Sequence, residues 1–253
     1  MKRSILLFSI LLILLTGCGP KEPVTSLYSD LLSEYGIQTK DQHTLAEFSY
    51  SVLDHYFNED VKQKDMSSTA FQEFDYDMVF ITYLNEGSLR CSYGGGSDSM
   101  FNRLANDLLD ANLDCIEDER FGGAISADEI DTVEIVFSFL FNRTKLHYNS
   151  LDDLENKIEL GINAIELEAG GRTAYFKESV PISHNYDLEY TLLRLCLKAD
   201  QEEDCYLDSG SDLYIYDTYT FKVDRDYTVT DLHRYSAYVD LKSIISDSIL
   251  QRL

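Results

Sequence analysis

The chain has 253 residues, of which 44% are hydrophobic, and this is enough for one core of ordinary domain size. Acidic residues outnumber basic residues by 45 to 21, which gives a formal net charge of −24. A surface this acidic repels nucleic-acid phosphates and anionic lipid headgroups, so it excludes nucleic acid as a partner and charge-driven adsorption to membranes. The charge is typical of a protein that stays soluble outside the cell.

The N-terminus has the pattern of an export signal. Lys2 and Arg3 precede an apolar run over residues 5–15, which is followed by Thr-Gly-Cys ending at Cys18. The run is too short to cross a bilayer as a mature helix, which needs about 20 apolar residues. The cysteine at this position favours a lipoprotein signal over an ordinary cleaved leader. We therefore expect residues 1–17 to be removed and Cys18 to carry acyl chains such as palmitate.

This leader predicts a cell-envelope protein that contacts the membrane through its lipid anchor. The anchor would lie in the outer membrane or on the extracytoplasmic face of the plasma membrane. Residues 18–43 are mixed and polar and are predicted to form a tether. The folded domain is predicted to begin at Thr44, where Thr44 and Glu47 form a capping box ahead of an amphipathic helix.

A β-hairpin is predicted next, with strands at residues 78–84 and 88–91. The turn between them is Asn85-Glu86-Gly87, and Gly94-Gly95-Gly96 is expected to break the second strand. Strict alternation over residues 133–141 predicts a long strand with one apolar face. Between the hairpin and this strand, a helical stripe is formed by Phe101, Leu104, Ala105, Leu108 and Leu109.

Local signals of helices and strands continue in the second half of the domain. A short capped helix is predicted over residues 150–158, and a hairpin over residues 164–176 turns at Gly170-Gly171. Asp187 is predicted to cap a further helix, and residues 213–223 alternate as a tyrosine-rich strand. This order of helices, hairpins and single strands favours an α+β domain with an antiparallel sheet over a parallel α/β domain.

Residues 224–253 are expected to form a C-terminal extension. Its apolar residues have the spacing of an amphipathic helix, which either docks on the domain or serves as an interface to a partner.

Four cysteines remain once Cys18 is lipidated, and an even number in an oxidising compartment favours disulfides. Three pairings are possible. We favour Cys91 with Cys115, which bracket a loop and a helix, and Cys196 with Cys205, which lie at a helix end and in the loop after it. Buried free thiols are the alternative.

Several short strings in the chain resemble the AMMECR1 family in their order and spacing. They are Phe80-Ile81-Thr82, Leu89-Arg90-Cys91-Ser92-Tyr93-Gly94, Glu117-Asp118-Glu119-Arg120-Phe121, Gly170-Gly171-Arg172 and Leu195-Cys196-Leu197-Lys198-Ala199. The resemblance covers residues 44–223. It implies an α+β fold in which a smaller subdomain packs on a larger antiparallel sheet and forms a cleft lined by these motifs. No settled activity or cofactor comes with the family, so the cofactor is left unknown.

The chain departs from the family pattern at three places. Ser92 occupies the position of the family's cysteine, and Cys91 occupies that of a glycine. If that cysteine is a nucleophile or ligand in relatives, its direct role is lost here. Ser183 stands where a glutamate is expected, and Gly122-Gly123 replaces a pair of prolines.

The family cleft is the predicted ligand-binding site. Arg90 and Asp118 could form a charge pair that positions a carboxylate or phosphate, or a buried pair that fixes the loop to the helix end. The glycine run could cradle an anion, but a turn followed by a helix cap at Asp98 is favoured. The residues assigned to the cleft are Arg90, Ser92, Gly94, Asp118, Arg120 and Phe121.

No metal site and no catalytic residue is predicted. The five histidines are scattered, and the cysteines do not form a CxxC motif. The string Asp208-Ser209-Gly210-Ser211-Asp212 favours a solvated turn over a calcium loop. The tyrosines clustered at residues 206–219 could line a sugar- or peptide-binding face, although alternating aromatics in strands more often pack in the core.

Two functions from different classes follow. The favoured hypothesis is a lipid-anchored module that binds a small molecule or a protein partner. The alternative is an enzyme or enzyme subunit in which Arg90, Asp118 and Arg120 orient a small anionic substrate.

Overall fold

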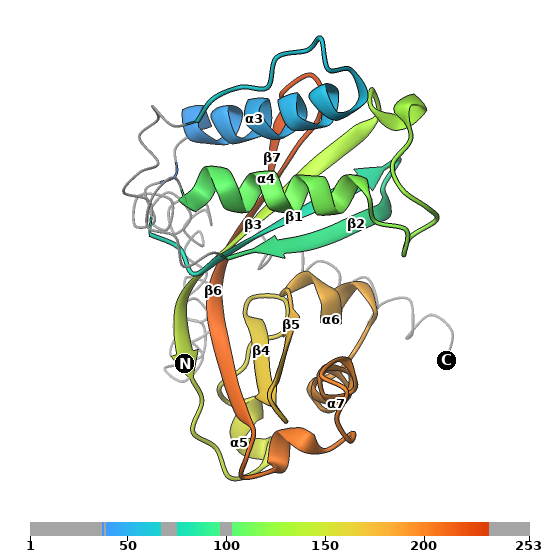
Figure 1. Ribbon diagram of the computed structural model, residues 1–253. Helices are drawn as coiled ribbons and strands as arrows, with labels where there is room; N and C mark the ends of the chain where they lie inside the picture. Colours follow the sequence, from blue (N-terminus) through green and yellow to red (C-terminus); the bar gives the residue numbers. More distant parts are fainter. Residues whose placement is uncertain (1–36, 38, 67–74, 97–102, 233–253) are drawn as a thin grey trace, which may run out of the picture. The chain divides into compact units, whose positions relative to one another are not determined.

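The computed structural model describes residue 37 and residues 39–66, 75–96 and 103–232 (Figure 1). The chain divides after Gln38, and every element named below belongs to the second unit, Thr39–Leu253. The leader, Cys18 and the amphipathic part of the C-terminal extension lie outside the described residues. Within those residues, no helix combines the length and hydropathy needed to span a membrane.

One antiparallel sheet organises the domain. Its strand order is β2-β1-β3-β6-β4-β5, and β7 pairs with β6. The alternating segment predicted at residues 133–141 forms a strand that extends to residue 145, and the α+β class is confirmed. The strands are β1 (Met78–Asn85), β2 (Ser88–Gly95), β3 (Val133–Lys145), β4 (Ala164–Ala169), β5 (Arg172–Phe176), β6 (Asp212–Val223) and β7 (Val229–Asp231).

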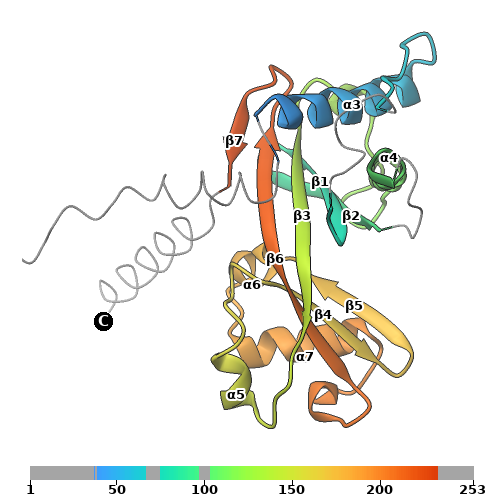
Figure 2. The same ribbon diagram turned by 90° about the vertical axis from the view of Figure 1, so that its left-hand side faces the viewer.

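The two long strands β3 and β6 run through both ends of the sheet (Figure 2). Their register shifts between Phe141 and Thr144, where Asn142 has a positive φ of 57°. On one side of this bulge β3 pairs with β1, and on the other side β6 pairs with β4. A bulge bends and twists a strand, so the shift marks the boundary between two lobes of one continuous sheet.

The first lobe, which we call the α4 lobe, has two helices, α3 (Thr39–Phe57) and α4 (Arg103–Ile116). Helix α4 packs on β1 and β2, whereas α3 packs on α4 and β7, and both helices contribute apolar stripes to the core. A buried polar chain links the layers: Tyr83 Oη donates to Asn112 Oδ1 at 2.7 Å, and Asn112 Nδ2 donates to Ser49 Oγ at 3.0 Å. These bonds satisfy groups that would be costly to bury alone, and they tie both helices to the sheet.

The second lobe, which we call the α7 lobe, has its own apolar cluster, which includes Ile165, Leu167, Leu192 and Leu195. Asp187 caps α7 as predicted, since its carboxylate accepts a hydrogen bond from the Tyr190 N–H. Besides β4 and β5, the lobe contains α5 (Leu151–Glu155), α6 (Ser179–Ser183), α7 (Leu188–Lys198) and the 3-10 helix η3 (Cys205–Leu207).

The predicted start of the first helix is wrong. Helix α3 begins at Thr39, so Thr44 lies inside the helix, where its hydroxyl donates to the Lys40 carbonyl oxygen at 2.9 Å. A Thr hydroxyl can be satisfied by the preceding turn of a helix as readily as it can cap one. At the other boundary, β7 pairs with β6, so the sheet continues past residue 223, where the domain was expected to end.

The glycine run also differs from expectation, because β2 continues through Gly95. A Cβ on Gly95 would lie 2.5 Å from the Asp107 carbonyl oxygen of α4, and a Cβ on Gly94 would lie 2.6 Å from the Phe80 ring. The two glycines therefore allow close packing of the helix and of an aromatic ring on the strand. Asp98, the predicted cap, lies outside the described residues.

Both predicted cysteine pairs are present. Cys91 of β2 is bonded to Cys115 of α4, with a Cα–Cα distance of 5.2 Å. Cys196 of α7 is bonded to Cys205 of η3, with a Cα–Cα distance of 5.7 Å. Each bond fastens a helix to a neighbouring element of its own lobe, and the free-thiol alternative does not hold.

Candidate functional site

Arg90 is the first predicted cleft residue, and the pairing expected for it is wrong. Its partner is Glu129 rather than Asp118, with Nε to Oε1 at 2.6 Å and Nη2 to Oε2 at 3.0 Å. Its remaining donors bind the carbonyl oxygens of Phe121, Gly123 and Ala124. Sequence spacing could not separate the two acidic partners, since both lie on the segment that follows α4.

The Arg90–Glu129 pair holds this segment against β2. The hydrogen bond from Arg90 is the largest cause that lowers the pKa of Glu129 to about 2. Glu129 closes η2 (Ala127–Glu129), where its carboxylate accepts from the Ser126 N–H at 3.0 Å. Gly122 has a φ of 100°, and a Cβ there would lie 2.9 Å from Arg90 Nη1. The positive φ and the missing side chain of Gly122 let the loop wrap around the guanidinium.

Asp118 instead pairs with Arg120, two residues along the same loop. Oδ1 accepts from Nε and Oδ2 from Nη2, both at 2.9 Å. Asp118 is buried, whereas the Arg120 side chain is 55% exposed. The hydrogen bond from Arg120 is the largest cause that lowers the pKa of Asp118, so this carboxylate stays ionised and orients the guanidinium.

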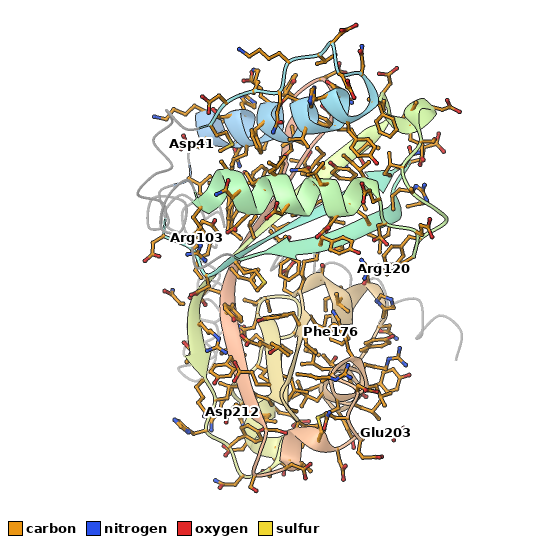
Figure 3. All side chains as sticks on the ribbon, viewed as in Figure 1. Asp41, Arg103, Arg120, Phe176, Glu203 and Asp212 are labelled. Carbon is orange, nitrogen blue, oxygen red and sulfur yellow. A yellow bond between two sulfur atoms is a disulfide. The ribbon has the colours of Figure 1, made fainter. Side chains whose placement is uncertain are left out.

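Arg120 contacts β2, which is an edge strand of the sheet. Its Nη2 donates to the Ser92 carbonyl oxygen at 3.2 Å. Its guanidinium lies 4.6 Å from the centre of the Tyr93 ring and 5.2 Å from that of Phe121. These contacts fix a cation beside Ser92, and Figure 3 places Arg120 on the side of β2 that faces the α7 lobe.

Ser92 is joined to the second lobe through hydroxyl groups. Thr82 lies directly opposite Ser92 in the β1–β2 register, and their Oγ atoms are 2.9 Å apart. Lys177, which follows β5, donates from Nζ to Thr82 Oγ1 at 2.6 Å. Lys177 is 9% exposed and Thr82 is 6% exposed, so the hydrogen bond that connects the two lobes is shielded from bulk water.

Lys198, at the end of α7, brings a second cation toward Arg120. Its Nζ donates to the Tyr175 carbonyl oxygen at 2.7 Å and lies 5.3 Å from the centre of the Phe176 ring. Much of the Lys198 side chain is exposed, but its ammonium end is held against these groups. Desolvation, followed by the positive charge of Arg120, lowers the pKa of Lys198.

The predicted site residues therefore fall into two groups. Ser92, Asp118, Arg120 and Phe121 meet at the edge of β2, whereas Arg90 is occupied in holding the loop and Gly94 has a packing role. Sequence reasoning missed Tyr93, Thr82, Lys177 and Lys198. Thr82 could have been found from the hairpin register, but no local signal places the two lysines beside a strand some 80 residues or more earlier in the chain.

The other candidate features do not form a second site. In residues 39–66, 75–96 and 103–232, no three His, Cys, Asp or Glu side chains are arranged to hold a metal ion. Asp212 of the oxygen-rich string pairs with Lys145 at 2.7 Å. Tyr206, Tyr216 and Tyr219 are buried, which supports core packing over an exposed binding face for this cluster.

The fold and its motifs can be compared with known proteins. Protein NEQ441 of Nanoarchaeum equitans is 29% identical over 114 residues, which cover 45% of this chain and 63% of that protein. A protein of Methanococcus aeolicus is 28% identical over 120 residues, which cover 47% of this chain and 60% of that protein. The chain thus spans less than two thirds of the length of these two relatives.

The structure also resembles a solved one. It superposes on the crystal structure of the uncharacterized protein PH0010 from Pyrococcus horikoshii with a TM-score of 0.65, covering 77% of this chain and 98% of that one at 19% identity. At this identity the likeness shows the fold alone. The AMMECR1 family profile matches residues 46–221, which is more than half of the chain and contains both lobes. The chain belongs to the AMMECR1 family.

Proposed function

We propose that the protein is a lipid-anchored binding module that takes an anionic group of a ligand or partner at the edge of β2, beside Arg120 and Lys198. One observation carries this proposal. Asp118 and the Ser92 carbonyl hold the 55% exposed Arg120 guanidinium at the edge of β2, and after desolvation its positive charge is the second cause that lowers the pKa of Lys198, in a chain with a formal charge of −24. An anion between the two cations would relieve their repulsion.

The guanidinium of Arg120 is suited to binding. Asp118 and the Ser92 carbonyl fix its orientation, and among the described residues its Nη1 has no hydrogen-bond acceptor. A donor held in place before the ligand arrives loses little conformational entropy on binding. The same argument does not apply to Arg90, since its donors already bind Glu129 and backbone carbonyls.

The anchor is supported by the sequence of the leader. A charged start, a short apolar run and a cysteine after Leu-Thr-Gly favour lipidation of Cys18. Two acyl chains are enough for stable attachment to a bilayer. Mass spectrometry of the protein purified from its membrane fraction tests this part of the proposal: a mature chain that begins with an acylated Cys18 is expected, and an intact Met1 in the soluble fraction would refute it.

The binding site is tested by thermal shift of the purified full chain in the presence of inorganic phosphate or acetate at constant ionic strength. Wild type is expected to gain several degrees in Tm at saturating anion, because a ligand that binds only the folded state stabilises it. Arg120→Ala should abolish the gain. Arg172→Ala is the matched control, since Arg172 is exposed and pairs only with the exposed Asp200 among the described residues.

An unchanged Tm for wild type, or an equal gain in Arg120→Ala, would contradict the proposed site. The enzyme alternative predicts a different result, namely turnover of an anionic substrate that is lost in Arg120→Ala.

A further inference from the structure

We infer that Ser92 presents a hydroxyl donor that Lys177 orients through Thr82, so that Ser92 and Arg120 together bind one compact oxyanion, a carboxylate or a phosphate. This inference rests on the proposed function and names the ligand chemistry of the same site. It also assigns a role to a serine that occupies the position of the family's cysteine.

The first step is the direction in which Ser92 points. Cys91 faces α4, where it is bonded to Cys115. Successive side chains of a strand point to opposite faces, so Ser92 lies on the face away from α4. Thr82 lies opposite Ser92 on that face, with an Oγ–Oγ distance of 2.9 Å. The hydroxyl pair therefore lies on the face of the hairpin where Lys177 of the other lobe reaches it.

The second step is the direction of the hydrogen bonds. An ammonium group carries only donors, so Thr82 Oγ1 must accept from Lys177 at 2.6 Å. Thr82 has a single hydroxyl hydrogen, and among its contacts with the described residues Ser92 Oγ is the remaining acceptor. Because Thr82 is 6% exposed, leaving that hydrogen unbonded would be costly. Thr82 thus donates to Ser92.

The third step concerns the hydrogen of Ser92 itself. Its oxygen accepts from Thr82, and within the described part of the chain no acceptor lies in reach of its own hydroxyl hydrogen. Ser92 is partly exposed, so this hydrogen is available to a ligand. The ammonium charge of Lys177 polarises the hydroxyls of Thr82 and Ser92 and makes Ser92 a stronger hydrogen-bond donor.

The direction of these hydrogen bonds argues against Ser92 as a nucleophile. Nucleophilic attack by serine needs a base that takes its proton, either directly or through an intervening group. Here Lys177 donates to Thr82 and Thr82 donates to Ser92, and an ammonium group has no site that accepts a hydrogen bond. An oxygen that accepts a hydrogen bond from Thr82 is also a weaker nucleophile. The chain of groups is therefore built to donate rather than to attack.

The fourth step concerns the second donor. Arg120 Nη2 donates to the carbonyl oxygen of Ser92 at 3.2 Å, so the guanidinium lies at the outer edge of the same residue whose hydroxyl lies on the face away from α4. Asp118 occupies Nε and one side of Nη2, which leaves Nη1 directed away from the pair. One hydroxyl and one guanidinium donor match two oxygens of a single small anion.

The test is isothermal titration of the purified full chain with acetate and, separately, with inorganic phosphate, at pH 7 and constant ionic strength. Ser92→Ala removes the donor and is expected to weaken binding about tenfold, as for the loss of one hydrogen bond to a charged group. Ser92→Thr keeps a hydroxyl and should restore most of the affinity. Ser88→Ala is the control, because Ser88 is an exposed serine of the same strand.

Thr82→Val breaks the connection to Lys177 without removing Ser92 and is expected to weaken binding by a smaller factor than Ser92→Ala. A circular dichroism melt of each variant shows whether the fold survives. The preferred anion distinguishes the two ligands: tighter binding of acetate assigns a carboxylate, and tighter binding of phosphate assigns a phosphate.

The outcomes separate the inference from the function on which it rests. If Arg120→Ala loses binding while Ser92→Ala binds like wild type, the role of Ser92 is overturned and the proposed anion site stands. If wild type binds neither anion, the proposed site fails and the inference fails with it. Covalent labelling of Ser92 by a fluorophosphonate probe would also overturn the inference, since it would show an activated nucleophile.

Discussion

Arg90 and Arg120 both pair with a carboxylate on the segment after α4, yet their surroundings differ. Arg90 is 13% exposed, and its donors bind Glu129 and three backbone carbonyl oxygens. Arg120 is 55% exposed, and its pair with Asp118 leaves Nη1 without an acceptor in the described structure. The first guanidinium holds a loop in place, whereas the second is held in place by its loop.

This difference shows why a family motif does not by itself assign a role. Both arginines lie in strings that resemble the family, and both were expected in the cleft. Only the number of donors already bound within the protein separates them, and that number depends on how the loop folds. An arginine whose donors are bound by backbone carbonyls stabilises structure, and one whose orientation is fixed but whose face is open can bind a ligand.

The Cys91–Cys115 disulfide joins the strand that carries Arg90 to the helix that precedes Arg120. Its removal is the test with the largest expected effect. The double variant Cys91→Ala/Cys115→Ala should lower the free energy of unfolding by about 3–4 kcal/mol, because it opens a loop of 24 residues and leaves space in the core. If the arginine pairs alone hold the loop, anion binding should survive in the folded variant. Urea unfolding and titration with phosphate measure the two effects.

The matched control for this variant is Cys196→Ala/Cys205→Ala. That bond closes a separation of 9 residues, so its loss should cost about 1 kcal/mol less in the chain-entropy account. A larger loss from the Cys196–Cys205 pair would show that the α7 lobe, rather than the segment after α4, limits the stability of the domain.

Substitution of each arginine sharpens the comparison directly. Arg90→Ala leaves Glu129 and three carbonyl oxygens without their donor and is expected to lower the free energy of unfolding by about 3 kcal/mol. Arg120→Ala removes a largely exposed side chain, and the buried Asp118 keeps its hydrogen bond from the main-chain N–H of residue 120, so the loss should be smaller, about 2 kcal/mol. Urea unfolding of both variants checks the order, and equal losses would contradict the separate roles.

Much of the fold could be predicted from the sequence. Alternation at residues 133–141, the turns at Gly87 and Gly170-Gly171, and the cap at Asp187 are local signals, and all four are confirmed. The predicted helix start at Thr44 is wrong because a hydroxyl inside a helix can bond to the preceding turn, so a capping pattern does not fix where a helix begins.

The site could be predicted only in part. The loop that carries Asp118 and Arg120 was found, since both lie in one short string. The choice between Asp118 and Glu129 as the partner of Arg90 depends on the loop path, which Gly122 permits through its positive φ. Lys177 and Lys198 belong to the other lobe, on the far side of the register shift near Asn142, so no short string of the sequence relates them to β2.

The smallest expected effect is a dependence of stability on pH. The pKa of Glu129 is about 2 in the folded protein, below its ordinary value of 4.5, because Arg90 stabilises the ionised form. A depressed folded pKa contributes stability that is complete above the unfolded value and is lost as the pH falls from about 4.5 toward 2. Solvent screens this pair in part, so the loss should be roughly 1 kcal/mol.

Glu129→Gln isolates this contribution from that of Asp118, whose pKa is lowered in the same direction by Arg120. Urea unfolding at pH 5 and at pH 3 should show a smaller loss of stability in Glu129→Gln than in wild type. Asp118→Asn should likewise flatten the profile, but it should also reduce anion binding at pH 7, because the guanidinium of Arg120 loses its orienting partner. Glu129→Gln should leave anion binding almost unchanged, and a reversal of these two patterns would exchange the roles assigned to the two arginines.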